Sequence, residues 1–234
     1  MQGYGDASLW DWSGALLNGA VVTLEIALAA YAIGLLLGLL GAIAKLSRVP
    51  PLQALATAYS TLIRAVPELL LIIILYYAGQ TALNNLMRAL DVSGAVEISG
   101  FAAAIAVLAL VQGAYMTEVF RGAIVAIPRG QIEAADAFGF SRWKRFRHII
   151  APAMLPNALP GLSNLWLILV KDTALVSVVG FEELFFTAQQ AAASTRNYFL
   201  FYAAAGALYL VMTLGSNAIF QRAERHVRRG QIQA

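Results

Sequence analysis

Long apolar runs constrain the fold of this chain more than any other feature. A helix needs roughly 20 apolar residues to cross the hydrocarbon of a bilayer. Hydrophobic residues make up 60% of the 234 residues, charged residues only 12%, and the mean hydropathy is +0.70. These values exclude a soluble enzyme with a large core and are typical of a membrane protein. We therefore expect an all-α integral membrane protein with about five transmembrane helices.

We expect one transmembrane domain that covers residues 1–234. The predicted spans are about residues 15–44, 52–77, 101–127, 153–179 and 198–220, and a polar loop occupies residues 129–151. Residues 84–100 and 182–195 are predicted to be loops, the second with a short surface helix over residues 184–191. Gly34, Gly38 and Gly41 recur at small-residue spacing, which lets a second helix approach closely, within the chain or at a subunit seam.

Basic residues gather on one side of these spans. Lys45, Arg48, the bases of loop 129–151 and those after Phe220 share one side, whereas Arg88 and Arg196 fall on the other. The positive-inside rule then places loop 129–151 and the C-terminus in the cytoplasm, and the N-terminus outside. Because topology explains the high sequence pI of about 9.3, no nucleic-acid partner is expected.

The longest strongly polar interruption, residues 131–161, contains the signals of a helix–turn–helix. Gly139 can end a first helix in a left-handed conformation, and the Ser141 hydroxyl can cap a second helix of about residues 142–150. The second helix carries a cluster of bases: Arg142, Lys144, Arg145, Arg147 and His148. A two-helix element between two membrane spans is expected to dock on a soluble partner.

Particular motifs in this region and around it resemble those of a known family. Glu133-Ala134-Ala135, Gly139 four residues later and Leu155-Pro156 resemble the coupling-loop motif of ABC-importer permease subunits. Residues 63–68 (IRAVPE), 115–123 (YMTEVFRGA) and 171–177 (KDTALVS) extend this likeness over nearly the full chain. Taken together, the chain resembles the permease subunits of polar amino acid importers, most closely the Q-type subunits of histidine/lysine/arginine/ornithine transporters.

The resemblance implies a type I ABC-importer permease fold in the bacterial inner membrane, crossing it several times. It also implies four kinds of partner: a homologous M-type permease chain, two copies of a cytoplasmic ABC ATPase, a periplasmic amino-acid-binding protein and membrane lipid. The sequence has no G-x-x-x-x-G-K-[ST] phosphate loop. We therefore expect a non-catalytic subunit that binds no cofactor or metal, with ATP and magnesium on the ATPase.

In the resembling family the short helix of the coupling loop lies in a groove of the ATPase. The residues assigned to ATPase coupling on this basis are Gln131, Glu133, Ala134, Ala135, Gly139, Pro152 and Pro156. Glu133 would bond at the socket, Ala134 and Ala135 would keep the contact face shallow, and Gly139 would permit the turn. The alternative interpretation is a solvated basic helix.

Polar residues inside the predicted spans are the candidates for a substrate path. A charge within the bilayer costs about 3 kcal/mol or more unless it is paired or faces water. The candidates are Glu25, Arg64, Glu68, Tyr115, Glu118, Lys171, Asp172, Thr173 and Ser177. A cavity with charges of both signs suits an amino acid, which carries a carboxylate and an ammonium group. The unpaired carboxylate of Glu25 would favour a positively charged side chain.

A structural alternative stays open for most of these candidates. Arg64 with Glu68, and Glu118 with Arg121, have the spacing of helix neighbours that neutralise each other locally. The hydroxyls of Thr173 and Ser177 can bond to carbonyls of their own helix. Tyr115 can be a packing residue, and Glu25 can bond to a neighbouring helix.

The predicted function is import of polar amino acids, in particular the basic histidine, arginine, lysine and ornithine. Another polar amino acid or an opine is the alternative within this class. An ion-driven secondary transporter is a different class, but it usually carries internal repeats in a longer chain. A membrane enzyme would need a nucleophile and a base, and the two histidines, His148 and His226, lie in basic segments without such partners nearby.

Overall fold

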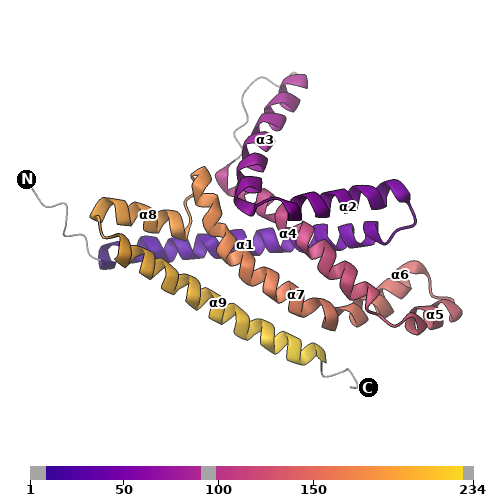
Figure 1. Ribbon diagram of the computed structural model, residues 1–234. Helices are drawn as coiled ribbons and strands as arrows, with labels where there is room; N and C mark the ends of the chain where they lie inside the picture. The colour runs from indigo at the N-terminus through magenta and orange to yellow at the C-terminus, as the bar shows by residue number, and fades with distance from the viewer. Residues whose placement is uncertain (1–8, 91–98, 229–234) are drawn as a thin grey trace, which may run out of the picture.

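The computed structural model describes residues 9–90 and 99–228, and within these ranges the chain is helical, without a strand (Figure 1). The elements are α1 (Leu9–Lys45), α2 (Pro50–Ala65), α3 (Glu68–Ala89), α4 (Gly100–Val125), α5 (Arg129–Ala137), α6 (Arg142–Arg145), the π turn η1 (Phe146–Ile150), α7 (Ala151–Asp172), the 3-10 segment η2 (Thr173–Val179), α8 (Leu184–Thr195) and α9 (Tyr198–Arg228). The α1–α2 turn, α5, α6 and the end of α9 lie toward one end of the molecule, here called the basic end.

Five helical segments are long and apolar enough to cross a membrane. They are Leu9–Lys45, Glu68–Ala89, Gly100–Val125, Arg142–Val179 and Tyr198–Val227. The prediction of an all-α protein with about five membrane helices is confirmed. The side of the membrane on which each end lies remains a prediction from the distribution of bases.

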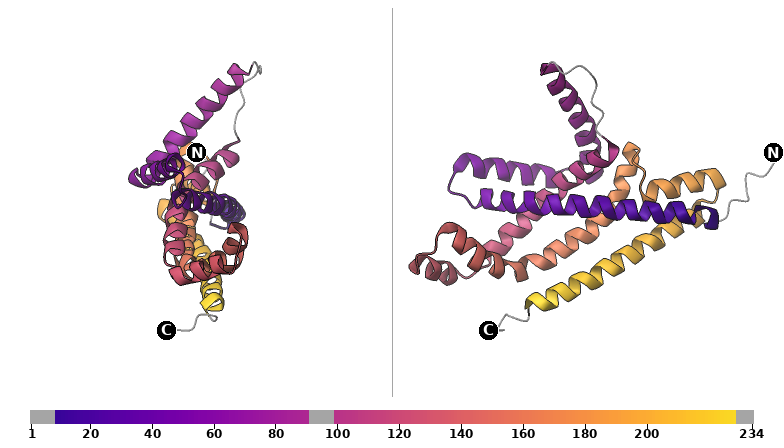
Figure 2. Two further views of the ribbon diagram at one scale, coloured as in Figure 1. Left: turned by 90° about the vertical axis from the view of Figure 1, so that its right-hand side faces the viewer. Right: turned by 180° about the vertical axis from the view of Figure 1, so that it is seen from behind.

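The second predicted span, residues 52–77, is not one helix. Val66 has an extended backbone, with φ −105° and ψ 141°, and α2 ends immediately before it. Pro67 causes this break because it lacks an N–H and disfavours a helical conformation at the preceding residue. The candidate span is therefore α3, which turns away from the α1–α2 pair (Figure 2). Helix α3 also includes residues 84–89 of the predicted loop 84–100, and residues 91–98 of that loop lie outside the described part.

The prolines that follow the polar loop do not interrupt the helix. Residues 142–179 form one continuous helical segment, so the predicted second short helix runs directly into the fourth span. Just before Pro152, the Ala151 N–H bonds to the carbonyl of Phe146, five residues back. This wider π turn accommodates a proline that can donate no backbone hydrogen bond. Pro156 and Pro160 then lie inside α7.

Helix α8 is a packed element, which corrects the prediction of a surface helix over residues 184–191. The helix extends from Leu184 to Thr195 and buries Leu184, Ala188, Ala191 and Ala192. Together with Leu16 and Phe201, these residues form a cluster that joins α8 to α1 and α9. Small side chains permit this close packing. The polar residues of the segment had led to the prediction of a loop with a surface helix.

The most extensive helix–helix contact joins α1 and α4. A Cβ atom placed on Gly38 would lie closer than 3.0 Å to the Cβ of Met116, and one on Gly41 would meet the Thr117 hydroxyl. Gly34 faces Met116 and Gln112 in the same way. The predicted glycine spacing therefore serves packing within the chain, where the backbones approach closely. We call this contact the glycine seam.

The glycine seam predicts that Gly38→Ala destabilises the protein. The added methyl group overlaps Met116, and overpacking of this kind costs about 1–3 kcal/mol. The thermal unfolding midpoint in detergent is expected to fall by several degrees. Gly206→Ala on α9 is the matched control, because nothing lies within 4 Å of its added Cβ. Equal midpoints for the two variants would contradict this account of the seam.

Candidate functional site

Charged side chains from α2, α3 and α7 meet a tyrosine of α4 in the middle part of the fold. We call Arg64, Glu68, Tyr115, Lys171 and Asp172 the central polar cluster. The break at residues 66–67 separates Arg64, in the last turn of α2, from Glu68, in the first turn of α3. Lys171 and Asp172 lie at the other change of helix type, where α7 gives way to the 3-10 segment η2.

Contacts within the central polar cluster join opposite charges through an aromatic ring. The Arg64 guanidinium lies 5.8 Å from the centroid of the Tyr115 ring, a cation–π distance. The Tyr115 hydroxyl lies near the Glu68 carboxylate. Asp172 is close enough to Glu68 and Lys171 for their charges to interact. The cluster thus offers two carboxylates, an arginine, a lysine and a hydroxyl to a zwitterionic ligand.

A second group of charges, the Glu118 cluster, lies closer to the basic end. One carboxylate oxygen of Glu118 pairs with Lys45 and accepts from the Ser60 hydroxyl at 3.2 Å. Its other oxygen accepts from Arg121 Nε at 2.9 Å. Lys45 also donates to Ser60 at 2.9 Å, and the Lys45 side chain is only 11% exposed. The predicted Glu118–Arg121 pair is therefore present as part of a larger network.

Arg64 does not form the predicted pair with Glu68. Its nearest acidic partner is Glu118, at 3.9 Å, a distance at the limit of an ion pair. The helix break explains the difference, because residues four apart share a face only on a continuous helix. Arg64 therefore lies between the central polar cluster and the Glu118 cluster and links them.

Three other predicted path residues have different positions. Glu25 lies on the exposed face of α1, beside the exposed Val21 and Leu28, and outside both clusters. Thr173 donates to the Val170 carbonyl at 2.8 Å and Ser177 to the Ala174 carbonyl at 2.7 Å. Both hydroxyls are thus used within the helix, as the structural alternative proposed, although the acceptors lie three residues back.

The predicted coupling residues divide into exposed and buried ones. We call residues 129–150 the elbow, in which Gly139 has a φ of +72° and the Ser141 hydroxyl accepts from Lys144 N–H, as the sequence predicted. The exposed members are Gln131, Glu133, Ala134, Gly139 and Pro152. Ala135, only 4% exposed, and Pro156 are buried. These two shape the elbow and α7 from inside and present no surface to a partner.

Sequence reasoning missed a buried acid between the fourth and fifth spans. Glu183 is 0% exposed and accepts from Tyr209 at 2.7 Å, from Thr23 at 3.2 Å and from the Phe186 N–H at 2.9 Å. It joins α1, α8 and α9 in this way. Burial raises the pKa of the Glu183 carboxyl, and the hydrogen bonds that it accepts oppose part of this rise. It also caps α8, but glutamate is not among the usual N-cap residues, so the local sequence gave no signal of this role.

Comparison with known proteins agrees with this geometry. The sequence profile of the family described as "Binding-protein-dependent transport system inner membrane component" matches residues 16–229. The chain therefore belongs to this family, which confirms the resemblance drawn from the motifs. Membership of this family of ABC-transporter permeases implies an ATPase, a binding protein and a permease chain as partners.

Individual relatives and a solved structure indicate more closely which kind of permease the chain resembles. The chain is 43% identical to the histidine/lysine/arginine/ornithine transport system permease protein HisQ of Escherichia coli (strain K12), over 93% of this chain and 95% of the relative. It is 39% identical to the octopine transport system permease protein OccQ of Rhizobium radiobacter, over 94% and 92%. A crystal structure of an amino acid ABC transporter matches with a TM-score of 0.78 and 32% identity, covering 93% of this chain and 96% of that chain. The ABC-importer permease fold is therefore confirmed.

The raised pKa of Glu183 predicts a pH-dependent difference between two variants. A carboxyl with a raised folded-state pKa contributes stability below its ordinary range, near pH 4.3, and that contribution is lost as the pH rises. Glu183→Gln keeps hydrogen-bonding groups without the charge. Its unfolding midpoint should therefore rise relative to that of the wild type as the pH rises from about 5 to 8. Glu183→Ala removes the acceptors and should cost about 1–3 kcal/mol at pH 5, and this cost should shrink toward pH 8 because the variant also lacks the titrating carboxyl. Parallel pH profiles for wild type and Glu183→Gln would contradict the assignment.

Proposed function

We propose that this chain is one of two permease subunits of an ATP-driven importer of polar amino acids, with preference for basic ones. The observation that carries the proposal is the central polar cluster, in which charges of both signs meet at a broken helix. Irregular backbone is tolerated at membrane depth where it is buried in protein or lines a water-filled cavity. In transporters, broken helices of this kind form substrate sites near the bilayer midplane.

The charges of the cluster fit the groups of a basic amino acid. The substrate carboxylate would be bound by Arg64 and by the N-terminus of α3, where free backbone N–H groups favour an anion. The α-ammonium and the cationic side chain would be bound by Glu68 and Asp172. Two carboxylates for two positive groups support a preference for arginine, lysine or ornithine over neutral amino acids. Glu25, outside the cluster, has no part in this arrangement.

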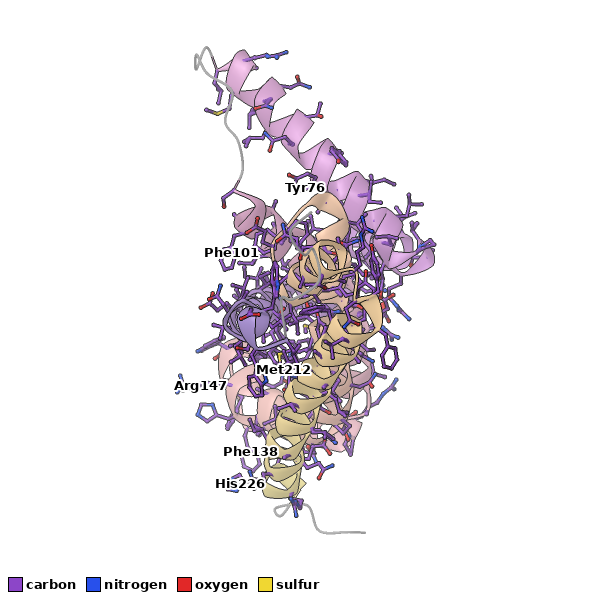
Figure 3. The ribbon with its side chains drawn as sticks, turned by 90° about the vertical axis from the view of Figure 1, so that its left-hand side faces the viewer. Tyr76, Phe101, Phe138, Arg147, Met212 and His226 are labelled. Carbon is purple, nitrogen blue, oxygen red and sulfur yellow. The ribbon has the colours of Figure 1, made fainter. Side chains whose placement is uncertain are left out.

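The exposed face of α3 supports a second permease chain. Of the residues of α3, Leu71 and Ile72 are buried. Its exposed apolar side chains include Leu69, Leu70, Ile74, Tyr77 and Leu86. Side chains along α3, Tyr76 among them, project away from the other helices (Figure 3). We assign this face to a homologous M-type subunit, which would close the substrate path.

The elbow is the proposed contact with the ATPase, on the cytoplasmic side. Its exposed residues, Gln131, Glu133 and Ala134, lie on α5 at the tip of the basic end. The elbow continues without interruption into α7, whose far end carries Lys171 and Asp172. A movement of the ATPase against the elbow would therefore reach the central polar cluster through one helical segment, a coupling between two distant sites.

Opine import is the second candidate, since relatives named for octopine and nopaline transport are 39% and 40% identical to this chain. Uptake in proteoliposomes that contain both permease chains, the ATPase and the binding protein separates the two. Competition by unlabelled arginine, but not by octopine, supports the basic amino acids. ATP-dependent uptake without a proton gradient excludes an ion-driven transporter.

The central polar cluster predicts a change in substrate affinity for Asp172→Asn. Loss of one carboxylate should raise the KM for arginine about fivefold, the order of a partly screened charge pair. The same vesicles should show a smaller change for glutamine, which lacks the side-chain charge. Glu182→Gln, an exposed acid outside the cluster, is the matched control. If the ratio of the KM for arginine to the KM for glutamine is unchanged, Asp172 does not bind the substrate side chain. The assignment of the chain to an importer would still hold.

The elbow predicts that Ala134→Leu abolishes uptake without unfolding the permease. The exposed Ala134 lies on α5, so a larger side chain obstructs a docked partner and disturbs no packing within the chain. Ala193→Leu places the same side chain at an exposed position of α8, at the opposite end of the molecule, and should transport normally. Co-purification of the ATPase should be lost for Ala134→Leu alone. Normal uptake by this variant would show that α5 is not the docking surface.

A further inference from the structure

A large cavity lies between the α1–α2 turn and the elbow, and the proposed function does not use it. Its volume is about 1140 Å³. Apolar side chains such as Leu46, Val49 and Ile124 form one part of the lining, and Arg48, Arg142 and Arg145 form another. We call it the elbow cavity.

The elbow cavity carries an excess of positive charge. Asp136 is the only acid among the described residues that line it, and it pairs with Arg145. Within residues 9–90 and 99–228, neither Arg48 nor Arg142 has an ion-pair partner, and both are exposed. The buried Nε of Arg145 has no hydrogen-bond acceptor in the described part of the chain. Two guanidinium groups without an ion-pair partner thus line a space in which the one carboxylate, that of Asp136, is already paired with Arg145.

The elbow cavity also lies at the level where membrane spans end. Arg48 lies three residues after the end of α1, Ile124 is in the last turn of α4, and Ile150 immediately precedes α7. Trp143, which also lines the cavity, is 66% exposed. Tryptophan and arginine at the end of an apolar helix are typical of the membrane–water interface. The cavity therefore opens where lipid headgroups and the first part of their acyl chains are found.

We propose that the elbow cavity binds an anionic phospholipid. The phosphate would be bound by Arg48 and Arg142, whose planar donors match its oxygens, and an acyl chain would follow Leu46, Val49 and Ile124. Basic pockets between transmembrane helices bind anionic headgroups in this way. A carboxylate of the ATPase would satisfy the arginines but would leave the apolar wall uncovered. The lipid would hold the α1–α2 turn against the elbow, independently of the transported substrate.

The test measures lipid binding to the purified complete transporter after delipidation, by native mass spectrometry. Phosphatidylglycerol should bind saturably and more tightly than phosphatidylcholine with the same acyl chains. The double variant Arg48→Gln/Arg142→Gln should bind phosphatidylglycerol roughly thirtyfold more weakly. Arg222→Gln/Arg225→Gln is the matched control, since these exposed arginines on α9 do not line the cavity. An unfolding midpoint close to that of the wild type establishes that the cavity variant is folded.

Four results would overturn the proposal. Equal binding of phosphatidylglycerol and phosphatidylcholine would show that the site does not prefer an anionic headgroup. Equal loss of phosphatidylglycerol binding in both double variants would show that surface charge in general, and not the elbow cavity, binds the lipid. Displacement of the lipid by inorganic phosphate at millimolar concentration would indicate a simple anion site without an acyl chain. Binding by the isolated permease pair, but not by the complete transporter, would identify the ATPase as the occupant.

Discussion

Close approach of α1 and α4 is the constraint on which the rest of the structure depends. Gly38 and Gly41 let the two backbones meet because any larger residue would overlap Met116 or Thr117. In a membrane, helices gain little from hydrophobic exclusion, so tight packing of small residues supplies much of the association. The glycine seam also sets the rotation and height of α1. Lys45 thereby meets Glu118 near one end, and Thr23 meets Glu183 toward the other.

The regularly packed helices support two irregular backbone segments, beside which the charged residues of the central polar cluster lie. The chain breaks between α2 and α3, and α7 tightens into η2 immediately after Asp172. Each change frees backbone groups close to a charged residue, which a lipid-facing position would not tolerate. In the Glu118 cluster, Lys45 and Arg121 surround the Glu118 carboxylate, and Arg64 joins this cluster to the central polar cluster. The polar residues thus follow one another from the middle of the fold toward the elbow.

Features set by local chemistry could be predicted from the sequence. The apolar runs gave the number of spans, Gly139 and Ser141 gave the turn of the elbow, and the glycine spacing gave the seam. The break at Pro67 was missed because the apolar residues of 52–77 outweigh Arg64 and Glu68, so the whole stretch has the hydropathy of one span. Pairings such as Lys45 with Glu118, 73 residues apart, leave no trace in a single sequence, since nothing local specifies the partner. The burial of α8 was missed for the same reason, because the apolar residues that cover it, such as Leu16 and Phe201, lie on α1 and α9.

The isolated position of α3 has a consequence for the cell. A membrane helix with so few neighbours contributes little to the stability of a lone subunit, and association stabilises it by mass action. A chain made without its companion would spend more time partly open, and proteases remove such molecules first. The abundance of the finished transporter would then follow the scarcer of the two subunits, and surplus copies of the other would be degraded. The sparse packing of one helix would in this way adjust subunit stoichiometry without a dedicated regulator.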